Sequence, residues 1–281
     1  MKTETKYKDR LFNFIFGREE HKDWTLSLYN AVNGSHYTDP DLVEFNTLEN
    51  TLYISMKNDT SFLISDIMSV YEHQSSYNPN MPLRMMEYTS NLYTGYLARN
   101  KYNKYSRTLI PLPVPKLVVF YNGEKEVEDE TILELSDAFP SELKFESDIE
   151  VRVKMLNINY DRNRELLRAC QPLGEYSWFV REVRSNLKIH TLEDAVDMAI
   201  QKMPDTYMLK PFLVAQKMEV CGMLDTEYNE DEIRELFMED GRREERQKTE
   251  AAEKRADEEK MRADAAEAEL AKYKDKFGAL N

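Results

Sequence analysis

The sequence is poor in the residues on which several common functional classes depend. It has two cysteines, eight glycines and four histidines among 281 residues. Two cysteines cannot build a disulfide framework or a cysteine-rich zinc site. No two glycines are separated by a single residue, which excludes a Walker loop and a dinucleotide-binding fingerprint. Neither the serine-hydrolase motif Gly-x-Ser-x-Gly nor the zinc-protease motif His-Glu-x-x-His occurs.

Long apolar runs are missing as well. No stretch of about 18 apolar residues is present, so we expect no membrane-spanning helix. The first ten residues are rich in charge, and the first 17 lack a signal-peptide apolar region followed by a small-residue cleavage site. We therefore expect a cytoplasmic protein. Hydrophobic residues make up 41% of the chain, which is enough to form a folded core.

The formal net charge of −14 is spread unevenly along the chain. Residues 1–120 carry 13 basic and 13 acidic side chains, residues 124–240 carry 14 and 28, and residues 241–281 carry 11 and 11. Residues 88–123 hold no acid and five basic residues, among them Lys101, Lys104 and Arg107. A polyanion can approach such a stretch although the rest of the chain repels it. We expect these three residues to contact phosphates, with a solvated loop as the alternative.

Hydrophobic periodicity predicts an α/β core followed by a helical region. Helices are predicted at 11–16, 24–32, 84–99 and over much of 162–218, and strands at 52–56, 62–64, 67–74, 116–121 and 151–158. We assign residues 1–160 to the core, 161–240 to the helical region and 241–281 to a charged tail. The tail has apolar residues seven apart, namely Ala256, Ala263, Leu270 and Phe277. This pattern predicts either a coiled coil that forms homo-oligomers or a solvated single helix.

The candidate chemistry lies in two neighbouring predicted strands. Asp59 precedes one strand, and Glu72 and Gln74 lie two apart on the next, so they share a face while His73 points the other way. If the strands pair, Asp59 reaches the same end as Glu72. Two converging carboxylates repel each other unless a cation joins them or one of them takes a proton. Mg²⁺ or Mn²⁺ is the natural cation, and it activates water for attack on a phosphodiester.

Each of these acids also has a structural interpretation. Asp59 follows Asn58 and is typical of a turn residue. Glu72 has a possible ion-pair partner in Arg84, at the start of the following predicted helix. Spacing alone does not decide between these roles and a metal site.

A longer pattern surrounds these acids. Tyr71 to Ser76, followed by Asn78 to Arg84 and Tyr88, resembles the signature of the Rpn family of recombination-promoting nucleases and transposase-like proteins. That family belongs to the PD-(D/E)XK nuclease superfamily. The resemblance spans about residues 6–240. It implies a restriction-endonuclease-like α/β core and a divalent-metal-dependent DNA endonuclease linked to DNA recombination and mobile elements.

The resemblance also implies roles for single residues. Asp59 matches the first metal-binding acid, Glu72 matches the acid of the (D/E)XK motif, and Gln74 stands where most members have lysine. Glutamine can orient a water molecule by hydrogen bonding but cannot supply the positive charge of lysine. Asp9 would be a further metal ligand, or else a first-turn acid favoured by the helix dipole. Arg84 would bind a backbone phosphate or orient Glu72, with a purely structural ion pair as the alternative.

Two other functional classes stay open beside the endonuclease. The first is a catalytically degenerate relative that binds nucleic acid or protein and oligomerises through its tail; the glutamine at position 74 and the net acidity favour it. The second is a scaffold built on the acidic helical half and the tail.

Overall fold

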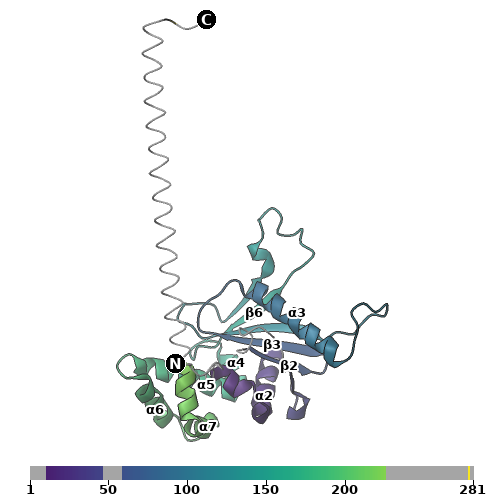
Figure 1. The fold of residues 1–281 in the computed structure, drawn as a ribbon. Coiled ribbons are helices and arrows are strands. Elements are labelled where there is room, and N and C mark those ends of the chain that lie inside the picture. The colour runs from purple at the N-terminus through teal and green to yellow at the C-terminus, as the bar shows by residue number, and fades with distance from the viewer. Residues whose placement is uncertain (1–10, 47–58, 226–277, 279–281) are drawn as a thin grey trace, which may run out of the picture. The chain divides into compact units, whose positions relative to one another are not determined.

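The computed structural model describes residues 11–46, 59–225 and 278 and shows a mixed α/β fold (Figure 1). The strands are β1 (Glu44–Phe45), β2 (Asp59–Ile64), β3 (Ile67–Gln74), β4 (Val114–Tyr121), β5 (Glu130–Glu134) and β6 (Arg152–Asn157). The helices are α1 (Leu11–Phe16), α2 (Lys22–Asn33), α3 (Met81–Arg99), α4 (Arg164–Ala169), α5 (Gln171–Leu187), α6 (Leu192–Lys202) and α7 (Leu209–Ala215). Short 3₁₀ turns lie at Glu19–His21, Pro40–Leu42 and Leu135–Ala138.

The six strands form one mixed sheet in the order β1-β2-β3-β4-β6-β5. β2 and β3 form an antiparallel hairpin in which Ser65 takes up a positive φ of 53° at the turn. β3, β4 and β6 run parallel, and β5 returns antiparallel along β6. A parallel pair needs a crossover connection, which α3 supplies between β3 and β4. The carboxyl ends of β3, β4 and β6 therefore meet at one end of the sheet.

Each face of the sheet is buried under a different set of helices. Met81, Met85 and Tyr88 of α3 pack on Val70 and Val119, which lie on one face. The other face packs against α1, α2 and the carboxyl-terminal helices in a core that extends from Leu11 to Leu224. Because successive strand residues point to opposite faces, β3 divides its side chains between the two cores.

The helical prediction for 162–218 is confirmed by α4 to α7. Glu175 of α5 ties these helices together because its two carboxylate oxygens accept hydrogen bonds from the backbone N–H groups of Met208 (3.2 Å) and Leu209 (2.8 Å). Those groups start α7, whose first N–H groups have no partner within the helix. The side chain of Glu175 is itself buried. The carboxylate thus positions α7 against α5.

Two proline positions differ from the predicted element boundaries. α3 begins at Met81, three residues earlier than predicted, because Pro82 lies in the first turn, where no helical N–H is required. β4 begins at Val114 and includes Pro115. β6 pairs with β4 only from Val118 onward, so no ladder bond from β6 to Pro115 is needed.

Several predictions concern residues outside the description. The strand at 52–56, Asp9 and, apart from Gly278, the tail at 241–281 that was predicted as a coiled coil or a single helix lie in ranges that the structure does not describe. Within residues 11–46 and 59–225, no helix is long and apolar enough to cross a membrane.

Candidate functional site

Glu72 and Gln74 occupy the carboxyl end of β3 and point toward α3. Both residues are buried, with 3% and 4% of the whole residue exposed. Gln74 Nε2 donates a hydrogen bond to Glu72 Oε1 (3.1 Å) and a second to the sulfur of Met81 (2.9 Å). Met81 is the first residue of α3, so the amino end of this helix covers the end of the strand. The predicted common face of Glu72 and Gln74 is present in the structure.

Arg84 neutralises the buried carboxylate. Its Nη2 lies 2.8 Å from Glu72 Oε1 and also donates to the Tyr88 hydroxyl (2.8 Å). Arg84 and Tyr88 are one helical turn apart on α3, which places both against β3. The expected contact between Arg84 and Glu72 is therefore present in the structure. Glu72, Gln74, Met81, Arg84 and Tyr88 are called the Glu72 cluster below.

Asp59 is the first residue of β2, and the β2–β3 register sets it directly opposite Glu72. It therefore belongs to a strand rather than to the preceding turn. Strand alternation assigns position 59 to the same face as Glu72. The side chain of Asp59 and the whole of Asp9 lie outside the described residues.

The chemistry of this position fits a hard divalent cation. Carboxylate oxygens are the ligands that Mg²⁺ and Mn²⁺ prefer, and Glu72 supplies one carboxylate with position 59 facing it. Among the described residues, no group of three or more His, Cys, Asp or Glu side chains converges on a common point. Arg84 already holds Glu72 Oε1, so a metal ion would share this carboxylate with Arg84 or displace it.

His73 points to the opposite face of the sheet, as predicted. Its ring stacks on Phe12 at 5.2 Å between centroids, and its Nε2 is hydrogen bonded to the Tyr176 hydroxyl (3.0 Å). Only 1% of His73 is exposed. This histidine therefore packs α1 and α5 onto the sheet and lies on the side away from the Glu72 cluster.

The predicted phosphate-binding residues Lys101, Lys104 and Arg107 are not brought near the Glu72 cluster. All three are exposed in the segment that follows α3. α3 has 19 residues and is therefore about 28 Å long. The helix begins beside Gln74 and runs to the other end of the sheet, where this segment enters β4. Any phosphate contact by these residues is thus remote from Glu72.

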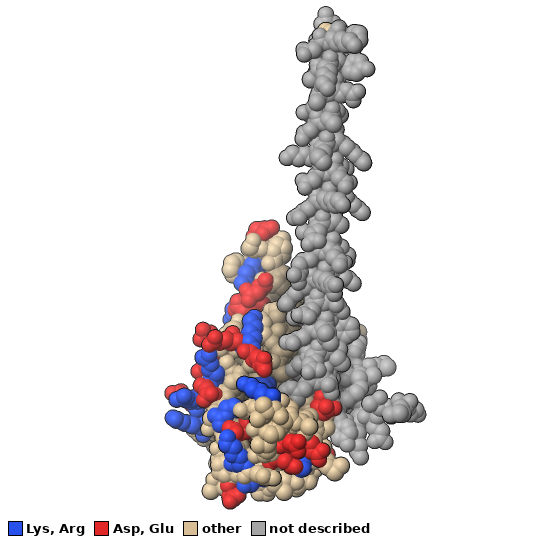
Figure 2. All heavy atoms as spheres, turned by 90° about the vertical axis from the view of Figure 1, so that its left-hand side faces the viewer, with Lys and Arg blue, Asp and Glu red and all other residues tan. Residues whose placement is uncertain are grey.

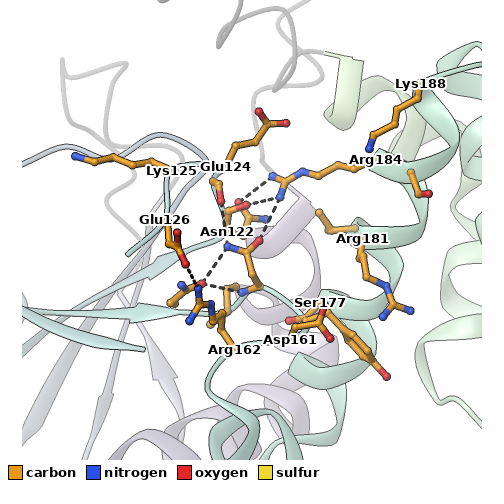
Figure 3. Close-up of a pocket in the computed structure, with 17 residues that line it drawn as sticks. Asn122, Glu124, Lys125, Glu126, Asp161, Arg162, Ser177, Arg181, Arg184 and Lys188 are labelled. Carbon is orange, nitrogen blue, oxygen red and sulfur yellow. Dashed lines mark hydrogen bonds and ion pairs between the residues drawn. The ribbon is translucent and has the colours of Figure 1, made fainter. Parts of the chain in front are cut away.

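A cleft of about 660 Å³ at the carboxyl ends of β4 and β6 was not predicted from the sequence (Figure 3). We call it the basic cleft. Its walls are residues 122–126 after β4, residues 157–162 at the end of β6, and the 177–188 part of α5. Asn122 and Asn157 lie within the span 6–240 over which the sequence resembles the Rpn family. No feature of the sequence pointed to Arg184, which lies at the centre of the cleft's hydrogen bonds.

A buried chain of hydrogen bonds connects the basic cleft with β3. Arg184 Nη1 donates to the Asn122 carbonyl and Arg184 Nη2 to Asn122 Oδ1 (3.4 Å). Asn122 Nδ2 donates in turn to the Tyr176 hydroxyl (3.3 Å), which is bonded to His73. These contacts fix the orientation of the Asn122 amide. His73, the residue next to Glu72 on β3, is thus connected to the cleft by hydrogen bonds.

A comparison of the sequence with models of known protein families identifies the family of this chain. A sequence model of the family described as "Putative transposase, YhgA-like" matches residues 53–202, just over half of the chain. The chain belongs to this family. The resemblance seen in the sequence is therefore confirmed at the level of the family, which connects the chain with recombination, mobile elements and DNA.

The segment matched by the YhgA-like family model begins ahead of β2 and ends at the last residue of α6. It therefore contains both the Glu72 cluster and the basic cleft. Comparisons with curated proteins and with solved structures gave no match.

Proposed function

We propose that this YhgA-like chain is a divalent-metal-dependent DNA endonuclease of the PD-(D/E)XK type, with its active site at the carboxyl end of β3. The observation that carries the proposal is the β2–β3 register, which pairs Asp59 with the buried Glu72. An antiparallel hairpin brings two acids from one short segment to directly opposite positions.

In this proposal Asp59 and Glu72 hold Mg²⁺ or Mn²⁺, with Asp9 as a further candidate ligand. Such an ion supplies Lewis acidity, which lowers the pKa of water and stabilises charge on a phosphoryl oxygen. Water adds to phosphorus and one ester P–O bond breaks, which yields a phosphate monoester and a free hydroxyl group. No covalent protein–DNA intermediate is required.

The chain's own residues orient the carboxylate. Gln74 donates a hydrogen bond to Glu72 Oε1, and Arg84 contacts the same oxygen at 2.8 Å. Gln74 and Arg84 are therefore positioning residues for Glu72. Burial of the cluster under Met81 limits the access of bulk water, which strengthens the electrostatic interactions there.

Cleavage of supercoiled plasmid tests the proposal. The wild type, Asp59→Asn and Glu72→Gln are compared with Mg²⁺, with Mn²⁺ and with chelator. Glu87→Gln is the matched control, because Glu87 is an exposed acid on α3 one turn from Arg84. We expect metal-dependent nicking by the wild type and the control, and a loss of about 100-fold or more in the two site variants. Nicking that persists in both site variants would refute the assignment.

One observation favours a second function, that of a non-catalytic DNA-binding relative. The Glu72–Arg84 ion pair already supplies a cation to the carboxylate, so the fold needs no metal to neutralise it. A Mn²⁺ titration followed by thermal unfolding separates the two functions. The nuclease should be stabilised by Mn²⁺ in the wild type and not in Glu72→Gln, whereas the non-catalytic relative should show no shift in either.

A further inference from the structure

The basic cleft differs in charge from the chain as a whole. Its lining carries five basic residues and three acidic ones, a formal charge of +2 within a chain of −14. The basic residues are Lys125, Arg162, Arg181, Arg184 and Lys188. The acidic residues are Glu124, Glu126 and Asp161. Figure 3 shows the Arg184 and Lys188 side chains extending from α5 toward the segment after β4, whereas Lys125 extends from that segment in the other direction. On the face drawn in Figure 2, basic and acidic side chains are interleaved.

Two of these cations are occupied by carboxylates. Arg162 pairs with Glu126 at 2.6 Å, and Arg181 pairs with Glu182 at 2.8 Å. Within the described part of the chain, Arg184, Lys188 and Lys125 have no carboxylate within ion-pair distance. Lys188 is exposed one helical turn beyond Arg184, and Lys125 Nζ lies 3.9 Å from the centre of the Tyr77 ring. Three positive charges of the cleft are therefore available to an anionic ligand.

Arg184 is held in place by neutral groups. Its Nη1 donates to the Asn122 carbonyl and to Asn159 Oδ1 (3.4 Å), and its Nη2 donates to Asn122 Oδ1 (3.4 Å). These bonds use three of the five N–H donors of a guanidinium group. The Nε–H and one Nη2–H remain, and they form one edge of the fork. That edge matches two oxygens of a phosphate group, and it is fixed before any ligand arrives.

The cleft lies at the same end of the sheet as the Glu72 cluster, on the α5 side. Gln74 is level with Tyr121 of β4, and Tyr121 is level with Asn157 of β6. Two strand spacings separate β3 from β6, which is about 10 Å. This distance corresponds to about three base steps along a nucleic-acid strand. The Glu72 side chain points to the α3 face and the cleft lies on the α5 face, so the two sites lie at the same end of the sheet on opposite faces.

We propose that the basic cleft binds phosphate groups of a nucleic-acid backbone, with Arg184 as the bidentate contact and with Lys188 and Lys125 as point charges. The nature of the polyanion rests on the proposed function, whereas the site itself rests on the geometry above. The contacts go to phosphates alone, so binding here is independent of base sequence. In the proposed nuclease, such contacts would hold nucleic acid at the end of the sheet where Glu72 lies.

Binding of a fluorescein-labelled 20-base-pair DNA duplex, measured in chelator at several salt concentrations, tests this site without any cleavage. We expect Lys188→Gln and Lys125→Gln each to weaken binding about 3- to 10-fold and to reduce the salt slope by about 1. Lys116→Gln removes an equal charge from an exposed site on the first half of β4 and should bind as the wild type does. Lys104→Gln reports separately on the segment after α3.

Arg184→Lys keeps the charge and removes the fork, so it should also weaken DNA binding. Because Arg184 supports Asn122, the thermal unfolding midpoint of the Arg184→Lys variant must be measured together with its affinity for DNA. The lysine variants at exposed positions 188 and 125 keep the test valid if Arg184→Lys fails to fold.

Wild-type affinity in cleft variants, or no DNA binding by the wild type, would overturn the proposal. Competition with inorganic phosphate identifies the ligand. Complete displacement of DNA by millimolar phosphate, with a wild-type salt slope near 1, would identify a small-anion pocket and overturn the nucleic-acid assignment. Binding that is lost in the cleft variants while plasmid is never nicked would support the cleft and refute the nuclease. Plasmid nicking by the wild type, together with unaltered DNA binding in the cleft variants, would support the nuclease and refute the cleft.

Discussion

The Glu72–Arg84 ion pair predicts an asymmetry between its two partners. The Glu72 side chain is 4% exposed and that of Arg84 is 36% exposed. In Arg84→Met, the carboxylate stays buried without its cation, which costs about 3 kcal/mol of unfolding free energy. In Glu72→Gln, the guanidinium can be hydrated by solvent, so we expect a loss of about 1 kcal/mol. The more exposed residue is thus the one whose removal costs more.

The double variant separates the pair from its surroundings. Once both charges are gone, no unpaired ion stays buried, so Glu72→Gln with Arg84→Met should cost about 2 kcal/mol, well below the sum of the single variants. The assay is urea unfolding at pH 7, followed by far-ultraviolet circular dichroism. Mn²⁺ should also stabilise Arg84→Met, because the cation replaces the guanidinium, and it should leave the double variant unchanged.

Two results would refute this reasoning. Additive single-variant effects, within about 0.5 kcal/mol, would mean that the two charges do not interact. A larger loss of unfolding free energy in Glu72→Gln than in Arg84→Met would mean that burial does not determine which unpaired charge costs more.

Three further predictions follow from single residues. A Cβ at Gly123 would lie 1.9 Å from the Ser75 carbonyl oxygen, so Gly123→Ala should lower unfolding free energy by about 2 kcal/mol or more in urea titrations; an unchanged midpoint would contradict the close approach of these segments. Burial opposes ionisation of Glu182, yet hydrogen bonds from Lys202 and Arg181 outweigh it and lower its pKa below 4.5. The stabilisation from Glu182 is therefore complete above pH 4.5 and is lost as pH falls through the folded-state pKa, and Lys202→Met should flatten this acid limb in urea midpoints. Burial raises the pKa of the Cys170 thiol to about 11, so mass spectrometry should find Cys170 alkylated by iodoacetamide at pH 8 only after unfolding, and equal labelling in the folded protein would count against this burial.

The sequence was most informative where chemistry and periodicity coincide. The period-2 alternation of β3 correctly separated Glu72 and Gln74 from His73, because an extended chain leaves no other arrangement. The pairing of Asp59 with Glu72 followed from the short connection between two strands. The catalytic and metal-binding roles of these residues stay predictions.

Weak local patterns explain what the sequence did not predict. β5 spans Glu130–Glu134 and has a single buried residue, Leu133, so no apolar alternation marks it as a strand. As an edge strand it is defined by its pairing with β6. Pro82 and Pro115 lie just outside the predicted helix at 84–99 and the predicted strand at 116–121, although each lies in its element where its missing N–H has no cost.

The basic cleft was beyond sequence reasoning for a different reason. Its walls come from three segments, 122–126, 157–162 and 177–188, that approach one another only in the folded chain. In the sequence, Arg184 cannot be distinguished from any other surface arginine of an amphipathic helix. Only the folded structure shows that it contacts Asn122. Charge counts over long windows did not reveal the basic residues of the cleft, because residues 124–240 are strongly acidic overall.

The parallel strand order has a consequence for the sequence of folding events. The Glu72 cluster is assembled from residues 72–88, so the β2–β3 hairpin and α3 contain all of its described members. The basic cleft forms only after β6 has paired with β4 across the intervening residues 122–151 and α5 has packed. Closing long loops precedes the contacts that reward it, so these steps are slow. A partly folded chain would therefore possess the carboxylate and lack the basic cleft, and a ligand of the cleft would stabilise only the completely folded protein.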